Sequence, residues 1–118
     1  MPYMQATDLI KLIIDTLDDS KAIDITELDV TQLTDITDHL IICSAMSTRH
    51  ASALANKVIG AAKDNGVRPL HVEGEAEGEW VLIDLQDVIV HIMMPETRDF
   101  YSLEKLWSMT ETARTKVS

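Results

Sequence analysis

The carboxylates of this chain are the first side chains that could do chemistry. Asp84 and Asp87 flank a short turn between two apolar runs, and two such acids could hold magnesium in a nucleotidyltransferase-like enzyme. Paired metal carboxylates in such enzymes stand one residue apart on a strand, whereas D-L-Q-D places these three positions apart across a turn. Turn acids exposed to water are therefore the favoured interpretation, and the enzyme is kept as an alternative.

The other reactive side chains lack the spacing of known sites. No glycine pair has a phosphate-loop arrangement, the glutamates of GEAEGEW lack the order of a calcium loop, and the single Cys43 offers no thiolate pair. The histidines do not fall at zinc-motif spacings: His39, His50, His71 and His91. Ser47 and His50 could form a nucleophile and base, but helix capping explains their spacing better. The sequence thus predicts no catalytic residue, metal or cofactor.

Length and charge limit the remaining classes. The 118 residues leave room for one domain, residues 1–118, with a hydrophobic content of 46% that suits a folded core. The net charge of -10 disfavours broad binding to nucleic acid or anionic lipid. No apolar stretch approaches the length of a membrane span, and the first residues do not resemble a signal peptide. We expect a cytoplasmic protein in which Cys43 belongs to the core.

Periodicity predicts an α/β fold with a mixed sheet. Residues 6–19 have a helical repeat with a cap near Thr7 or Asp8, and a second helix starts at Ser47 and closes at Gly66. A last helix is expected to start at Pro95. The β-branched segments predict five strands, at 25–30, 39–45, 70–74, 79–85 and 87–93. The last two form an antiparallel hairpin, and the second helix makes a β-α-β crossover that makes part of the sheet parallel. The expected order is α-β-β-α-β-β-β-α.

The alternation of side chains along the hairpin points to a binding surface. Asp84 and His91 are polar and mark one face as solvent-exposed. Large side chains share this face with them: Trp80, Leu82, Ile89 and Met93. Exposed apolar groups of this kind usually bind a partner, although a terminal helix that covers them explains the pattern equally well.

Four blocks of the sequence carry a family resemblance. They are ITDHLIICSAMSTRH, VEGEAEGEW, DLQDVIVHIM and YSLEKLW, and their order and spacing closely resemble the ribosomal silencing factor family, also called Iojap-like proteins. The resemblance covers about residues 5–108, and residues 109–118 form a tail without a recognised counterpart.

The resemblance implies a five-stranded mixed sheet with helices, akin to nucleotidyltransferases but without their catalytic carboxylates and without known enzymatic activity. It implies binding to large-subunit ribosomal protein fourteen, which blocks subunit joining and represses translation when nutrients are scarce. It also implies that Trp80 contacts the partner. Tyr101 of the last block joins the six hairpin residues in the predicted partner-binding set. A role in large-subunit assembly is an open alternative, and the free protein is a possible homodimer.

Overall fold

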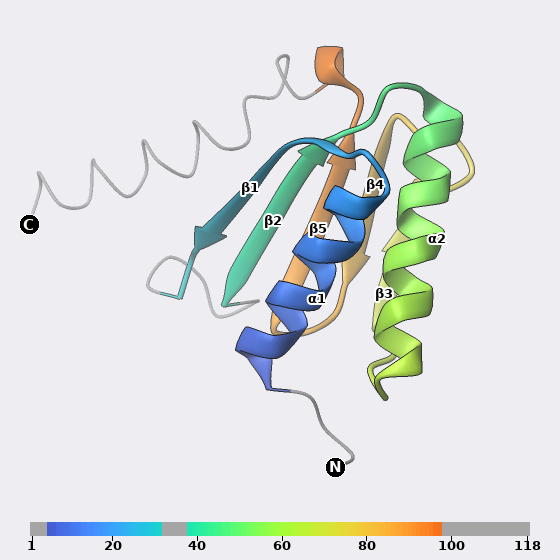
Figure 1. Cartoon of the computed structure of the whole chain (residues 1–118). Coiled ribbons are helices and arrows are strands. Elements are labelled where there is room, and N and C mark those ends of the chain that lie inside the picture. The colour runs from blue at the N-terminus through green and yellow to red at the C-terminus, as the bar shows by residue number, and fades with distance from the viewer. Residues whose placement is uncertain (1–4, 32–37, 98–118) are drawn as a thin grey trace, which may run out of the picture.

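The computed structural model describes residues 5–31 and 38–97, and it has the predicted α/β architecture with a five-stranded mixed sheet (Figure 1). Its elements are α1 (Ala6–Asp19), β1 (Ile23–Asp29), β2 (His39–Ser44), α2 (Thr48–Asp64), β3 (His71–Glu73), β4 (Trp80–Asp84) and β5 (Val88–Met93). Each predicted strand is present, with bounds that differ from the prediction by at most two residues. Pro95, Glu96 and Thr97 are helical, whereas the rest of the predicted last helix lies outside the described residues.

Helix α1 forms because apolar residues recur on one side of it. Its buried side chains are Leu9, Ile10, Ile13 and Leu17. The helix spans the predicted residues, but the predicted cap is wrong. Gln5 is the N-cap and makes no side-chain cap hydrogen bond, whereas Thr7 and Asp8 lie inside the first turn. Asp8 still places a negative charge near the helix N-terminus, where it is favourable.

Helix α2 begins and ends at the predicted signals. The Ser47 hydroxyl accepts a hydrogen bond of 3.0 Å from the backbone N–H of His50. At the other end the helix stops at Asp64, and Gly66 follows with a φ of 81°, which a side chain would disfavour. The helix buries Ala51, Leu54, Ala55, Val58 and Ala62.

The sheet has the strand order β1-β2-β5-β4-β3. Its parallel pair is β2 with β5, and the other neighbours are antiparallel. The crossover through α2 therefore does not place β3 beside β2, because the β4–β5 hairpin lies between them. This arrangement puts β5 at the centre of the sheet and leaves β1 and β3 at its edges.

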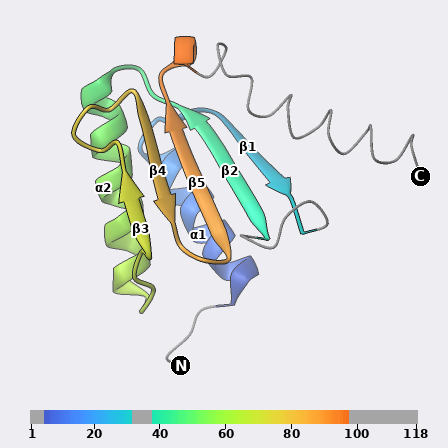
Figure 2. The same ribbon diagram turned by 180° about the vertical axis from the view of Figure 1, so that it is seen from behind.

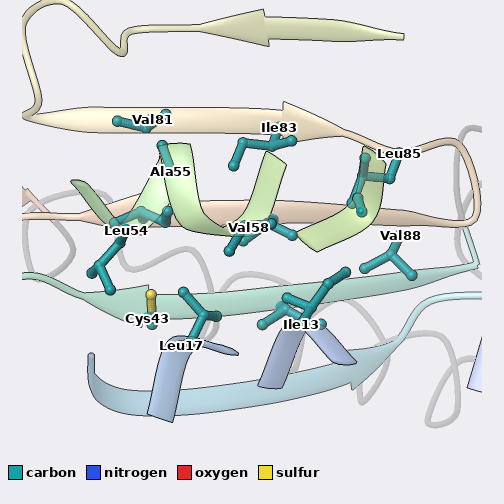
Figure 3. Packing of buried hydrophobic residues seen from close by; sticks show 14 of the residues in the cluster. Ile13, Leu17, Cys43, Leu54, Ala55, Val58, Val81, Ile83, Leu85 and Val88 are labelled. Carbon is teal, nitrogen blue, oxygen red and sulfur yellow. The ribbon is translucent and has the colours of Figure 1, made fainter. Parts of the chain in front are cut away.

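Both helices lie on one face of the sheet, and Figure 2 shows the sheet from the opposite side. The main core fills the space between the helices and this face. Figure 3 shows Leu17 of α1 and Leu54 of α2 near Cys43 of β2, with Val81 and Ile83 of β4 in the same core. Cys43 is fully buried, as expected of a core residue. Within the described ranges, neither helix has the length and apolar character needed to cross a membrane.

Candidate partner-binding face

The hairpin register brings six of the predicted site residues together. Trp80 lies opposite Met93, Leu82 lies opposite His91, and Asp84 lies opposite Ile89. Val81 and Ile83, the alternate residues of β4, belong to the core under the helices. The six side chains therefore share the face of the sheet that points away from both helices, as the alternation predicts. We call this set the Trp80 face.

The two strands of the Trp80 face differ in burial. On β4, Trp80, Leu82 and Asp84 are partly exposed. On β5 the three residues are buried, with exposed fractions of 9% for Ile89, 7% for His91 and 0% for Met93. The expectation that His91 marks a solvent-exposed side is therefore wrong. His91 lies on the central strand, between Ile42 of β2 and Leu82 of β4.

A hydrogen bond from the Trp80 side chain offsets the cost of burying the polar His91 ring. The Trp80 indole Nε1–H donates to His91 Nδ1 at 2.9 Å, and the two rings are tilted by 51° with centroids 5.9 Å apart. Because Nδ1 accepts this bond, the neutral ring carries its proton on Nε2. Burial lowers the pKa of His91 to about 4, since the charged ring would lose its solvation. His91 is thus a neutral hydrogen-bond acceptor at physiological pH.

The apolar surface continues from the Trp80 face toward β1. A second cluster contains the buried Val30, Leu40 and Ile89, with Leu28 and Leu82 packed against it. Leu28 pairs with Leu40, and Leu40 pairs with Ile89, so these side chains form one row across three strands. Leu28 and Leu40 are not among the residues predicted from the hairpin. The same alternation in residues 25–30 and 39–45 places them on this face.

The loop before Trp80 is held by its backbone, while its acidic side chains face water. Gly74 and Gly78 have φ angles of 79° and 76°, and the Gly78 N–H donates to the Gly74 carbonyl at 2.9 Å. The Ser52 hydroxyl of α2 donates to the Glu75 carbonyl at 2.6 Å. The loop glutamates are all exposed, as predicted for a solvated acidic loop: Glu73, Glu75, Glu77 and Glu79. These acids, which we call the acidic rim, therefore directly precede the partly exposed Trp80 in the chain, and the Ser52 bond holds their loop against α2.

The aspartates considered for metal catalysis have structural surroundings. Asp84 Oδ1 accepts a hydrogen bond of 2.8 Å from the backbone N–H of Gln86, which stabilises the hairpin turn. Asp87 is exposed. In residues 5–31 and 38–97, no group of three or more His, Cys, Asp or Glu side chains could hold a metal ion. The arrangement of Asp84 and Asp87 thus gives no support to the enzymatic alternative.

His50 connects the two helices. Its Nδ1 accepts from the Met46 N–H at 2.9 Å, so its Nε2 carries the proton and donates to the Ser20 carbonyl at 2.8 Å. Both ring nitrogens are thereby used in structural bonds, and the Ser47 hydroxyl accepts from the His50 backbone. The structure favours the capping interpretation of Ser47 and His50 over a nucleophile and base.

Tyr101, the remaining predicted site residue, lies outside the described residues, as does the tail at 109–118. The described part of the predicted site is therefore the hairpin alone.

Comparisons with known proteins agree with this fold. A family model described as "Ribosomal silencing factor during starvation" matches residues 3–118. Ribosomal silencing factor RsfS of Chromobacterium violaceum is 43% identical over 104 residues, which cover 88% of this chain and 85% of that protein. A crystal structure of a Chromobacterium violaceum protein is also similar, with a TM-score of 0.87 and 43% identity over 89% of this chain and 88% of that one.

A eukaryotic relative has a name that refers to the large ribosomal subunit. "Mitochondrial assembly of ribosomal large subunit protein 1" of Mus musculus is 32% identical over 103 residues, which cover 85% of this chain but 45% of that protein. Its name concerns large-subunit assembly, whereas the bacterial relatives are named as ribosomal silencing factors. With a family model that matches nearly its whole length, the chain belongs to the ribosomal silencing factor family.

Proposed function

We propose that this protein binds large-subunit ribosomal protein fourteen through the Trp80 face and thereby blocks association of the two ribosomal subunits. Repression of translation when nutrients are scarce follows from this blockade. Family membership carries the proposal. The partly exposed Trp80, on the side of the sheet away from α1 and α2, supplies a surface for it.

The burial pattern divides the Trp80 face into contacting and supporting residues. Trp80, Leu82 and Asp84 are partly exposed and would touch the partner. Ile89 and Met93 are buried beside them on β5 and would hold the surface in shape. Aromatic anchors with an apolar surround are common at the centres of protein interfaces, and Trp80 has this setting.

Charge supports a basic protein partner. The chain carries a net charge of -10, and the exposed glutamates of residues 73–79 directly precede Trp80 in the chain. Such a surface attracts a basic ribosomal protein and repels the phosphates of the surrounding RNA. Contact with protein is therefore favoured over contact with RNA.

Truncation of the anchor tests the proposal. Trp80→Ala should weaken binding to purified ribosomal protein fourteen by roughly thirtyfold, because an interface anchor is worth about 2 kcal/mol. The affinity is measured by calorimetry, and the fraction of joined ribosomes is measured by sedimentation after the protein is added to separated subunits. Wild-type protein should lower that fraction, and Trp80→Ala should not.

The control is Ile59→Ala. Ile59 is a partly buried side chain of α2, which lies on the opposite side of the sheet. It should keep normal affinity, and the melting temperatures of both variants show whether they are folded. A folded Trp80→Ala protein that binds normally would remove Trp80 from the interface. Unchanged subunit joining at saturating wild-type protein would refute the blockade.

Large-subunit assembly is a second candidate function, favoured by the name of the mouse relative. The two functions differ in when the protein acts. If the protein is an assembly factor, its depletion during growth should make precursors of the large subunit accumulate. If the protein is a silencing factor, its depletion should leave assembly normal and raise the fraction of joined ribosomes in starved cells. Gradient profiles of depleted cells in both conditions distinguish them.

A further inference from the structure

A buried imidazole lies beside the partly exposed indole on the Trp80 face. Trp80 belongs to β4 and His91 to β5, and they are diagonal neighbours across the hairpin because Trp80 pairs with Met93 and His91 pairs with Leu82. Diagonal neighbours on one face are within reach of long aromatic side chains. The 2.9 Å bond from Nε1–H to Nδ1 joins the two rings at this position.

This bond restricts how the indole can lie. The Trp80 side chain turns about two torsions, and a different rotamer would take Nε1–H away from His91 Nδ1. The imidazole is 7% exposed, so the loss of its donor inside the sheet would be costly. The indole is thereby held in one orientation before any partner arrives. Interfaces that are ordered in advance lose less entropy on binding.

We propose that His91 is a positioning residue for partner binding, which acts by holding the Trp80 indole in its binding orientation. The inference rests on the proposed function, and it assigns His91 a role without partner contact. Burial keeps the ring neutral down to about pH 4, so Nδ1 stays an acceptor under physiological conditions. His91 therefore supports the interface from the strand next to Trp80.

Two variants separate this role from simple packing. His91→Leu has a similar volume but no acceptor, whereas His91→Asn keeps an oxygen near the place of Nδ1 and loses buried volume. His91→Leu should melt near the wild-type temperature and bind large ribosomal subunits about tenfold more weakly, the loss expected for one hydrogen bond. His91→Asn should melt lower yet bind within about threefold of wild type. If His91 acted only by packing, the less stable variant, His91→Asn, would also bind more weakly than His91→Leu.

The indole itself gives a spectroscopic measurement. The Nε1–H resonance of Trp80 is assigned in the NMR spectrum by its loss in Trp80→Phe. In His91→Leu this resonance should move and its proton should exchange faster with water, because its acceptor is gone. In His91→Asn it should stay close to its wild-type position.

A double-mutant cycle tests whether His91 acts through Trp80. Trp80→Phe keeps an aromatic ring but removes the donor, so the added His91→Leu change should weaken binding little further. Additive losses in the cycle would overturn the inference, and so would normal binding by a folded His91→Leu protein. If wild-type protein fails to bind large subunits, the proposed function fails, and the inference falls with it. If wild-type protein binds large subunits and His91→Leu binds them equally well, the inference about His91 is wrong while the proposed function stands.

Discussion

Protonation of His91 is coupled to folding, because the buried ring has a pKa of about 4 in the folded state against an ordinary value of 6.5. Between these pH values the unfolded chain binds more protons than the folded chain. The contribution of neutral His91 to the free energy of unfolding is therefore complete above about pH 6.5 and is lost as the pH falls toward 4. The difference corresponds to about 3 kcal/mol in the free energy of unfolding. Urea denaturation of wild type and His91→Leu from pH 4 to 7 should show a steeper decline for wild type. Parallel curves, or a ring that titrates near 6.5 by NMR, would contradict this assignment.

At the scale of elements, the turn that leads into β4 depends on a glycine. A Cβ at Gly74 would lie 2.0 Å from the Trp80 carbonyl oxygen, and the φ of 79° is unfavourable for other residues. Gly74→Ala should therefore lower the free energy of unfolding by more than about 1 kcal/mol. Gly60 lies inside α2, where an added Cβ meets nothing within 4 Å, so Gly60→Ala should raise stability by about 0.5–1 kcal/mol. Chemical denaturation measures the free energy of unfolding of both variants. A Gly74→Ala protein as stable as the Gly60→Ala protein would show that the turn adapts to the added Cβ without cost.

At the scale of the whole molecule, charge should control the rate of association with a basic partner. Replacing Glu75, Glu77 and Glu79 by Gln should slow association several-fold at low salt, because these exposed acids lie in the loop that leads into Trp80. The matched control replaces Asp15, Asp18 and Asp19 of α1 by Asn, with the same change in net charge on the opposite side of the sheet. Stopped-flow rates should differ at low salt and converge near 1 M, where the screening length is about 3 Å. Equal slowing by both triple variants would mean that net charge, and not the acidic rim, steers binding.

The sequence by itself determined the elements and the parity of the hairpin. The helix at Ala6–Asp19, the Ser47 cap and the strand positions follow from patterns within a few residues, and the alternation placed Trp80, Leu82 and Asp84 on one face. The family resemblance also came from sequence alone, because its four blocks are contiguous in the chain.

Only the tertiary structure decided which strands are neighbours and which members of the Trp80 face are exposed. β5 lies between β2 and β4, so its side chains are covered from both sides, and His91 is buried although it is polar. Local alternation specifies the face of a strand but not its place in the sheet. The bond from Trp80 to His91 likewise joins residues on two strands, and its consequences for pKa and orientation arise from burial. Burial is set by residues distant in the sequence, which no local pattern contains.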